Sequence, residues 1–488
     1  MRSHEVVIAG GGPTGLMQAA ELTLPGIDVA IVEKRASQDL LGPRARGIHA
    51  RTIELLDQRG VADRFISHGR PHSSATFLDC PVDLGALPTR HNYVLELGQQ
   101  EIERLLAEWL GKLGTPIYRH REVRGFVQED AEIRVAVSDG TTLRAEYLVG
   151  CDGGRSLVRK AAGIAFPGHD ATTSWLMADV DFVEEPRWGF HTDALGRHAI
   201  RKLDDGRRAR IVLVEGRLNI CAQPDLQAVR GALAAVYGTD FGIHSPTWLS
   251  RFTDATRQAA AYRAGRVLLA GDAAHVHPPI GGQGLSVGIG DAVNLGWKLA
   301  QVVKGTSPDT LLDSYHAERH PAAARVLRNT MAEVACRRQD EGAKALKSVV
   351  SELLMGDEVR LQCAAEVSGL AYRYHCRGSH PLIGRRMPDV DLCSAEGHLR
   401  VFSLLHAARP LLLVLRDHGT IDISPWRDRV RQVDASCAGP WILPAVGAVS
   451  APHAVLVRPD GYVAWAGEAR HEGLRDALTM WFGSPGGA

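Results

Sequence analysis

A glycine-rich turn near the N-terminus constrains the fold more than any other feature of the chain. Residues 10–15 read GGGPTG, directly after the apolar stretch 6–9, and the helical pattern that follows ends near Pro25 and Gly26. A second apolar stretch occupies 28–33, so the first 35 residues have the pattern strand, helix, strand. Continuous apolar runs are typical of strands buried on both faces, and the pattern therefore predicts a parallel sheet in an α/β fold.

The same turn has the spacing of a dinucleotide site. Gly10, Gly12 and Gly15 fit GxGxxG, in which glycines let backbone N–H groups approach a pyrophosphate at the positive end of a helix. The second strand ends at Glu33, where a carboxylate can accept hydrogen bonds from ribose hydroxyls and would repel a 2′-phosphate. The spacing therefore favours FAD or NAD over NADP, with a βαβ unit that binds nothing as the alternative.

Two further apolar runs end in acidic residues. Residues 147–154 (YLVGCDGG) place Asp152, and residues 266–275 (RVLLAGDAAH) place Asp272, just after a predicted strand. Ligands of open α/β sheets lie beyond the carboxyl ends of the strands, so both aspartates are expected at one crevice. Behind Asp272, a glycine-rich turn leads into a predicted helix that follows Gly284, and its first N–H groups can face an anionic group such as reduced flavin. The alternative is an ordinary glycine-rich turn beside a solvated aspartate.

The pattern changes twice along the rest of the chain. Between about 171 and 254, alternating stretches such as RHAIRKL and RARIVLVE predict an antiparallel sheet inserted into the first domain. A long helix is expected from about 313 to 338. From about 385 a separate α/β pattern begins, which includes a hairpin at 453–467 and a final helix at 472–482.

Composition excludes several kinds of partner and site. The chain has 488 residues, with 56 Lys and Arg against 56 Asp and Glu, and no run of like charges. This charge distribution argues against nucleic acid and anionic membranes as partners. No window has the length of a membrane span or of a signal-peptide core, which predicts a cytoplasmic protein without a membrane partner. The eight cysteines are isolated and form no CxxC pair, as expected of free thiols in a reducing compartment. His275 and His277 lie beside Asp272, but no metal site is expected there.

Taken together, the motifs resemble the FAD-dependent aromatic hydroxylases of the p-hydroxybenzoate hydroxylase type, the group A flavoprotein monooxygenases. The resemblance rests on VVIAGGGPTGL with Glu33, on PRARGIHARTIELLDQRG, on YLVGCDGGRSLVRKAAGIAFPG and on GRVLLAGDAAHVHPPIGGQGLSVGIGDAVNLGWKLA. It continues through LLDSYHAERHP and RPDGYVAW and thus spans nearly the whole chain. Within the family, the motifs are most similar to those of aromatic polyketide hydroxylases and rifampicin monooxygenases.

The resemblance implies a domain organisation. A Rossmann-like FAD-binding domain would be discontinuous, at 1–75, 98–170 and 255–340. An inserted antiparallel-sheet domain at 76–97 and 171–254 would bind the substrate. Residues 341–384 would form a helical linker, and 385–488 a thioredoxin-like α/β domain, whose lack of a CxxC pair argues against redox chemistry there.

The resemblance also implies the residues that hold FAD. Gly10, Gly12, Thr14 and Gly15 would hold the pyrophosphate, with Glu33 on the adenosine ribose and Lys34 beside it. Arg44 would reach the phosphates, Gln99 would lie near the ribityl chain, Asp152 is associated with FAD and the nicotinamide cofactor, and Asp272 would bind the ribityl chain. The backbone from Pro278 through Ser286 would face the isoalloxazine ring, with Gly282, Gly284 and Leu285 among its residues. No catalytic side chain is singled out.

Two positions depart from the family pattern. Ser286 replaces a frequent Asn and Gly290 a frequent Gln, changes that leave backbone donors in place and bear on flavin mobility rather than on FAD binding.

The activity implied is hydroxylation of a polycyclic aromatic compound, a polyketide or an aromatic antibiotic. NADPH or NADH would act as a transient electron donor, and O2 would react through a flavin hydroperoxide. Baeyer–Villiger oxygenation or N-hydroxylation in the same family, an FAD-dependent dehydrogenase or reductase of the same fold, and a noncatalytic nucleotide-binding protein are the alternatives. The sequence leaves a homodimer open.

Overall fold

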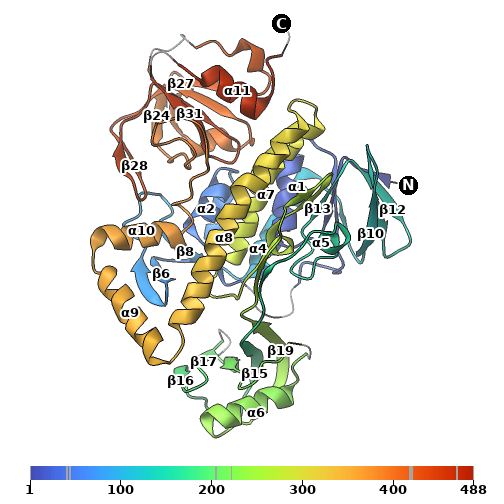
Figure 1. Ribbon diagram of the computed structural model, residues 1–488, viewed down its shortest axis with the longest axis vertical. Coiled ribbons are helices and arrows are strands. Elements are labelled where there is room, and N and C mark those ends of the chain that lie inside the picture. Colours follow the sequence, from blue (N-terminus) through green and yellow to red (C-terminus); the bar gives the residue numbers. More distant parts are fainter. Residues whose placement is uncertain are drawn as a thin grey trace.

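The computed structural model describes residues 2–39, 42, 45–203, 206–220, 223–416, 421–468 and 471–486. Its elements form three groups along the long axis of the molecule (Figure 1). The glycine-rich turn belongs to the middle group, an antiparallel sheet with one helix lies at one end, and the C-terminal strands lie at the other.

The middle group is built on a six-stranded sheet in the order β21-β22-β13-β2-β3-β9. Every neighbouring pair is parallel except β21 and β22 at one edge. This confirms the parallel sheet predicted from the apolar runs. The strands are β2 (Val6–Ala9), β3 (Val29–Val32), β9 (Ile117–Tyr118), β13 (Tyr147–Gly150), β21 (Arg263–Ala264) and β22 (Val267–Leu269).

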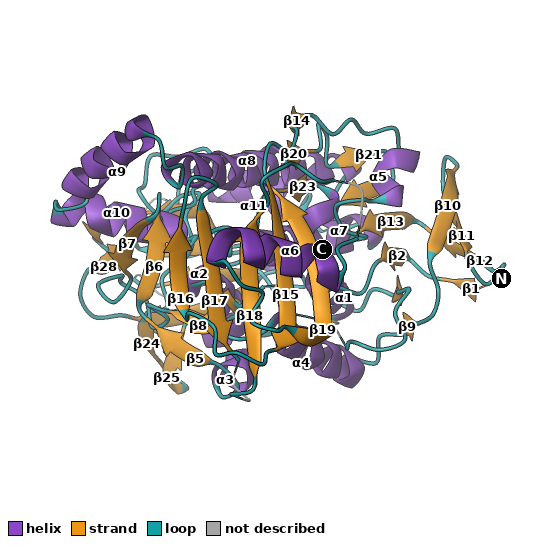
Figure 2. Cartoon of the chain, turned by 90° about the horizontal axis from the view of Figure 1, so that it is seen from below, coloured by secondary structure: helices purple, strands orange, loops and turns teal. Residues whose placement is uncertain are grey.

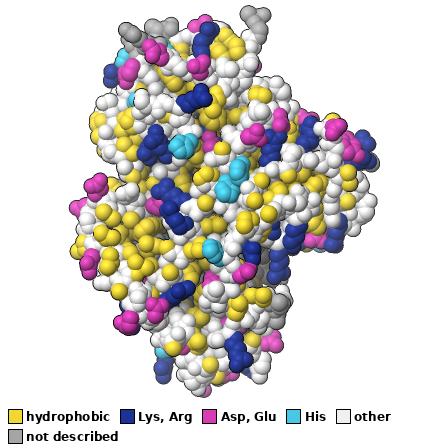
Figure 3. Space-filling view, in the orientation of Figure 1, with side chains coloured by type: hydrophobic (Ala, Val, Ile, Leu, Met, Phe, Trp, Pro, Cys, Tyr) yellow, Lys and Arg dark blue, Asp and Glu magenta, His cyan; other side chains and the backbone are white. Residues whose placement is uncertain are grey.

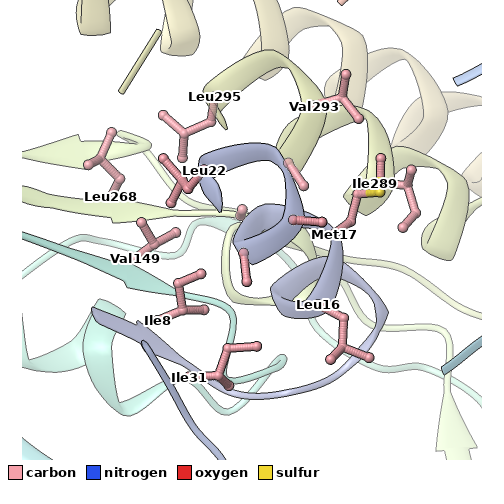
Figure 4. Packing of buried hydrophobic residues seen from close by; sticks show 14 of the residues in the cluster. Ile8, Leu16, Met17, Leu22, Ile31, Val149, Leu268, Ile289, Val293 and Leu295 are labelled. Atoms are coloured by element: carbon pink, nitrogen blue, oxygen red, sulfur yellow. The ribbon is translucent and has the colours of Figure 1, made fainter. Parts of the chain in front are cut away.

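Helix α1 packs on strands β2 and β3 of this sheet, and two further helices pack on α1. α1 (Pro13–Thr23) begins in the glycine-rich turn and packs against α7 (Gly284–Val303), while α4 (Gln99–Leu113) lies on its other side. Figure 4 shows the side chains that hold these layers together, among them Ile8 and Val149 from the sheet, Leu16 and Met17 from α1, and Ile289 from α7. These residues are almost fully buried, and the apolar area removed from water stabilises the contact.

A smaller sheet lies beside the first one and was not anticipated from the sequence. Its order is β1-β12-β11-β10, an antiparallel meander closed by a parallel pairing with the N-terminal residues. The burial pattern of β11 alternates strictly, as expected for a sheet with one face on the core. The strands are β1 (Arg2–Ser3), β10 (Val123–Gln128), β11 (Ile133–Val137) and β12 (Thr142–Ala145).

The antiparallel sheet expected between 171 and 254 is present, with the order β16-β17-β18-β15-β19 (Figure 2). One face packs on α6 (Leu226–Tyr237), through buried side chains such as Leu176, Ile211 and Leu213. The alternate residues, among them Trp175, Met177 and Val212, point to the opposite face, which lines a cavity and is called the free face below. The strands are β15 (Ser174–Asp181), β16 (Gly189–Thr192), β17 (Arg197–Lys202), β18 (Arg208–Val214) and β19 (His244–Thr253).

Three helices follow α7 along the chain. α8 (Asp313–Cys336) runs through the middle of the molecule and matches the long helix expected there (Figure 1). α9 (Glu341–Leu353) and α10 (Asp357–Val367) lie in the segment expected to be a helical linker, whereas 368–384 contains no helix. Both helices pack on the hairpin of β6 (Ser74–Phe77) and β7 (Cys80–Asp83), and their outer faces leave apolar side chains exposed (Figure 3).

Short elements connect the hairpin to the middle group. β4 (Gly47–Ile48), β8 (Val94–Glu96) and β5 (Arg70–His72) form a three-stranded sheet, and α2 (Ala50–Asp57) and α3 (Ala62–Ile66) lie between β4 and β5.

The C-terminal group is a second mixed sheet, in the order β25-β24-β27-β26-β30-β31. Only β26 and β27 pair in parallel, and the predicted hairpin is formed by β30 and β31. α11 (Leu474–Phe482) ends the group close to the predicted bounds. The strands are β24 (Asp391–Ser394), β25 (Gly397–Arg400), β26 (Leu411–Val414), β27 (Arg431–Ser436), β30 (Ala454–Val457) and β31 (Val463–Gly467).

Buried charges join the C-terminal group to the middle group. Arg458 donates to both carboxylate oxygens of Glu318 on α8, at 2.5 and 2.8 Å, and also pairs with Asp460. Lys298 on α7 donates to the same Glu318 at 2.7 Å. Burial would raise the pKa of Glu318, but Arg458 and Lys298 outweigh this and lower it to about 2. The carboxylate is therefore ionised in the interface.

The described cysteines, which leave out Cys221, are all free thiols. Among the helices of the described chain, none combines the length and the hydropathy needed to cross a bilayer.

Candidate functional site

One large cavity connects the carboxyl edge of the central sheet to the free face of the antiparallel sheet. Its volume is about 1840 Å³. Gly15, Pro278 and Ser286 are not among its lining residues, and Arg44 lies outside the described residues. The other predicted site residues line it: Gly10, Gly12, Thr14, Glu33, Lys34, Gln99, Asp152, Asp272, Gly282, Gly284 and Leu285.

The glycine turn is shaped by close backbone approaches on one side and is open on the other. Gly10 has a φ of +102°, and a Cβ there would lie 2.5 Å from the carbonyl oxygen of Cys151. A Cβ on Gly15 would overlap the carbonyl oxygen of Gly10, which explains why Gly15 supports the turn without lining the cavity. Gly12 has open space around it and precedes α1 without a side-chain cap. The start of α1 is thus available to an anionic ligand.

Glu33 is buried, with 4% of its surface exposed, and is already engaged within the protein. One carboxylate oxygen accepts from the Gly11 N–H at 2.5 Å, and the other accepts from the backbone N–H and the Nε of Arg35 at 2.8 and 3.0 Å. Burial would raise its pKa, but these hydrogen bonds hold the pKa of Glu33 below its ordinary value. The carboxylate is ionised, and Arg35 is a neighbour that the sequence motif did not indicate.

Gln99 has a similar internal role. Its side-chain oxygen accepts from the Ala45 N–H at 3.2 Å, and its amide donates to Glu103 at 2.8 Å. Glu103 in turn accepts from Arg35 at 2.8 Å, so α4 and the end of β3 are tied together. Lys34, by contrast, is exposed at the cavity edge.

The two aspartates at the strand ends lie at one cavity, as expected, because β13 and β22 are parallel neighbours. They differ in their partners. Asp152 accepts from the Ser156 hydroxyl at 2.5 Å and from the N–H groups of Leu157 and Val158, so it caps α5 (Leu157–Ala161). Asp272 is exposed to the cavity and has no hydrogen bond or ion pair to any described residue. Asp272 is therefore the carboxylate available to hydroxyl groups of a ligand.

The start of α7 forms another part of the cavity. Gly281 and Gly282 have φ values of +72° and +66°, which glycine adopts without strain, and the helix begins at Gly284 without a side-chain cap. Pro278 is buried behind this turn, while Ser286 lines a small adjacent cavity, where its hydroxyl accepts from the His49 N–H at 3.4 Å. Gly281, Gly282, Gly284 and Leu285 line the large cavity.

Two neutral histidines border this turn. His49 donates from Nε2 to the carbonyl oxygen of Gly281 at 3.1 Å, and burial lowers its pKa to about 4. His49 is therefore a hydrogen-bonding residue of the turn rather than a base. His277 donates from Nδ1 to the carbonyl oxygen of Pro278 at 2.9 Å, and burial lowers its pKa as well.

A buried carboxylate on α7, Asp291, fastens the turn that carries Asp272. It accepts from the Gly271 N–H at 3.1 Å, from His275 Nε2 at 2.7 Å and from Arg319 Nε at 2.8 Å. Burial would raise the pKa of Asp291, but Arg319 and His275 hold it below its ordinary value. Asp291 and Arg319 lie within the sequence motifs, but the motifs did not indicate a role for either residue. The one signal in the sequence was an acidic residue, Asp291, inside an otherwise apolar helix.

The opposite side of the cavity is the free face of the antiparallel sheet. We call it the sheet wall, and it comprises Trp175, Met177, Arg197, Arg201, Arg210, Val212, Trp248 and Phe252. Trp175 and Phe252 stack with their ring centroids 5.0 Å apart and their planes 4° from parallel. We call the side formed by Gly10, Gly12, Asp152, Asp272, Gly282, Gly284 and Leu285 the motif wall.

No group of three or more His, Cys, Asp or Glu side chains arranged to hold a metal ion occurs in the described parts of the chain. His275, one of the pair weighed as metal ligands, is instead bonded to Asp291.

Comparison with known families agrees with this geometry. The model of the FAD binding domain family matches residues 3–330, and that of the aromatic-ring hydroxylase C-terminal family matches residues 380–485. The chain belongs to the FAD-dependent aromatic-ring hydroxylases. The hydroxylase is 41% identical to a rifampicin monooxygenase of Streptomyces venezuelae, over 98% of this chain and 99% of that protein.

Solved and more distant relatives complete the comparison. The structure of OxyS anhydrotetracycline hydroxylase from Streptomyces rimosus aligns with a TM-score of 0.92 and 42% identity, covering 99% of this hydroxylase and 100% of OxyS. A dialkyldecalin synthase of Streptomyces rugosporus is 37% identical over 99% of both chains.

Proposed function

We propose that this hydroxylase is an NAD(P)H- and O2-dependent FAD monooxygenase that hydroxylates a polycyclic aromatic natural product, a polyketide or an aromatic antibiotic. The observation that carries the proposal is the single cavity of about 1840 Å³ with glycine turns on one side and stacked aromatic rings on the other. The names of the rifampicin and anhydrotetracycline relatives support the substrate class.

The residues of the motif wall suit FAD. The open start of α1 at Gly12, with Gly10, Thr14 and Gly15, would hold the pyrophosphate, which Arg44 would also reach. Glu33 and Lys34 would lie at the adenosine ribose. Asp272 would accept from the ribityl hydroxyls, helped by Gln99, with Asp152 fixing the neighbouring turn. The turn from Pro278 to Ser286, with Gly282, Gly284 and Leu285, would face the isoalloxazine ring.

When bound, FAD would supply the redox chemistry: it takes up electrons from NADPH or NADH and activates O2. The first N–H groups of α7, at Gly284 and Leu285, would stabilise negative charge on the pyrimidine side of the ring, because they lie at the positive end of the helix dipole. We assign no proton transfer to a side chain of the motif wall. The protein's part is to bind, to orient and to exclude water.

The sheet wall would orient the substrate. Trp175, Trp248 and Phe252 offer flat apolar surfaces, and offset stacking against them would hold a planar polycyclic ring in one orientation. Met177 and Val212 line the same cavity, and their apolar side chains would help to exclude water from the reacting face.

We further propose the division of the chain into a discontinuous FAD-binding domain, an inserted substrate domain and a C-terminal thioredoxin-like domain without redox activity. The separate cores behind the central sheet, behind the antiparallel sheet and in the C-terminal sheet support this division. The buried charges of Glu318 and Arg458 argue that the third domain is a fixed part of the scaffold.

The test is oxygen transfer. The purified protein is expected to be yellow, and a substrate from a panel of rifamycins, tetracyclines, angucyclines and anthraquinones should accelerate NADPH or NADH oxidation, with one atom of labelled O2 in the product. Protein that binds no FAD would refute the proposal. Anaerobic turnover with an artificial acceptor would identify a dehydrogenase, and cyclisation without oxygen incorporation would identify a synthase. An inserted ring oxygen or an N-oxide would identify the other oxygenations of the family.

A further inference from the structure

We propose that the sheet wall binds an anionic group of the aromatic substrate, an ionised acidic hydroxyl or a carboxylate, through the guanidinium of Arg201. The inference rests on the proposed function and narrows its substrate to planar aromatic acids. It concerns a position on β17 that belongs to none of the sequence motifs.

The charges along one row of the antiparallel sheet do not balance. Asp179, Arg210 and Arg201 are directly opposite one another on β15, β18 and β17, and Arg201 and Arg210 both line the cavity. Arg210 donates from Nε and Nη2 to the two carboxylate oxygens of Asp179, at 2.8 and 2.9 Å. Because this carboxylate is fully used by Arg210, Arg201 is left as a second cation in the row.

The neighbouring charges do not neutralise Arg201 either. Arg46 pairs with Glu96 at 3.2 Å, and Arg197 lies 3.7 Å above the ring of Phe190. Partial burial and the charges of Arg46, Arg197 and Arg210 lower the pKa of Arg201, whereas Glu96 raises it. Within the described chain, Arg201 forms no hydrogen bond and no ion pair with a carboxylate, and its one ring contact is with Phe190, at 5.4 Å.

An unpaired guanidinium beside aromatic rings fits a particular kind of ligand. A guanidinium forms two parallel hydrogen bonds with a carboxylate and short charge-assisted bonds with an ionised hydroxyl. The excess of positive charge on this wall raises the local concentration of anions. Since Trp175 and Phe252 of the same wall offer a flat stack, the group that completes the site is an anion carried on a planar aromatic molecule.

Phosphate groups of the nicotinamide dinucleotide carry the same charge and are the competing source of an anion. The aromatic source is favoured because Arg201 shares its wall with stacked rings, while the glycine turns that suit phosphates lie on the motif wall. The experiment has to separate the two sources.

The test compares two anthraquinones on the FAD-loaded protein. Anthraquinone-2-carboxylate and the neutral 2-(hydroxymethyl)anthraquinone are titrated while the flavin spectrum is recorded. The wild type should bind the carboxylate about tenfold more tightly than the neutral compound, the size expected of a charged hydrogen bond. Arg201→Gln should abolish this preference, and Arg201→Lys should restore part of it.

Lys202→Gln is the matched control, because Lys202 is the next residue of β17, points to the other side of the sheet and is exposed. It should keep the full preference. A wild type that does not discriminate, or an Arg201→Gln protein that still does, would overturn the inference. In the second case, weaker binding of NADP+ or NAD+ by Arg201→Gln than by the wild type, measured in a titration of the same kind, would assign Arg201 to the dinucleotide. The titration needs no turnover, so it can fail or succeed independently of oxygen transfer.

Discussion

The two walls of the cavity are held in place by different forces. Behind the motif wall lie defined polar contacts: the buried Asp291 holds Gly271, His275 and Arg319, and the half-buried Asp152 caps α5. Behind the sheet wall lies an apolar core between the strands and α6. Buried polar networks fix one geometry, whereas apolar cores tolerate substitutions of similar volume. The cofactor side of the cavity is therefore rigidly specified, and the substrate side can change its side chains without losing the fold.

The largest expected effect is on the motif wall. Asp291→Asn would leave the buried guanidinium of Arg319 without its carboxylate, and removing one partner of a buried pair costs roughly 3–5 kcal/mol. The free energy of unfolding, measured by urea denaturation, should fall by this amount, and FAD retention should fall with it. Asp313→Asn, which removes an exposed partner of Arg263, is the control and should cost less than about 0.5 kcal/mol. Equal losses in the two variants would contradict the comparison.

The next effect is a pH dependence. His49 is buried and its pKa is lowered from 6.5 to about 4, so the unfolded chain takes up a proton on this residue before the folded protein does. Stability from the neutral ring is fully present above pH 6.5 and is lost as the pH falls towards 4, by up to about 3 kcal/mol. His49→Gln should flatten this part of the curve of unfolding free energy against pH, while His169→Gln, at an exposed position, should leave the curve unchanged. Identical slopes in all three proteins would show that His49 is not held neutral.

Asp272→Ala separates binding from stability on the motif wall. The side chain is exposed to the cavity and unpaired within the described chain, so its loss should leave the unfolding free energy within about 0.5 kcal/mol of the wild type. FAD affinity should weaken roughly tenfold to a hundredfold, since a charged acceptor for ribityl hydroxyls is removed. Equilibrium dialysis of the flavin measures this, and unchanged FAD affinity would count against the site.

The smallest effect is expected on the sheet wall. Phe252→Ala removes the ring that stacks on Trp175 and should raise the KM for an aromatic substrate about tenfold, since a stacked pair contributes about 1 kcal/mol beyond its burial. FAD content should not change. Trp188→Ala, in the same sheet region but outside the cavity lining, is the control. A loss of FAD in Phe252→Ala would mean that the two walls are not independent.

Sequence reasoning reached the motif wall because local sterics dictate it. Only glycine fits at Gly10 and Gly15, and strands that end in Asp152 and Asp272 must meet once the sheet is parallel. The partners that hold these residues were missed because they come from distant segments: Arg35 with Glu103, and Asp291 with Arg319. The place of Ser286 beside a second, smaller cavity, next to His49, could not be anticipated either, because His49 comes from a distant segment.

For the sheet wall, the sequence predicted the type of sheet but not the residues that face the cavity. The alternation of apolar and polar residues predicted an antiparallel sheet, but the residues that face the cavity depend on the strand register. A shift of one residue would place Ile200 instead of Arg201 on the cavity side. The meander of β10, β11 and β12 was missed although β11 alternates well. The packing of the helices of segment 341–384 on the β6–β7 hairpin is a further contact that the sequence did not indicate, because the two segments are far apart along the chain.

The pairing of Glu318 with Arg458 limits how such enzymes can be cut and recombined. Truncating the chain between the two family regions would remove Arg458, the partner of Glu318, and would uncover Glu318 and Lys298, which are now buried. Exchange of the last hundred residues between relatives should therefore succeed only when the residues at 298, 318, 458 and 460 travel together. The C-terminal region thus contributes to the position of α7 and α8 through these buried charges, and α7 is the helix that begins at the glycine-rich turn.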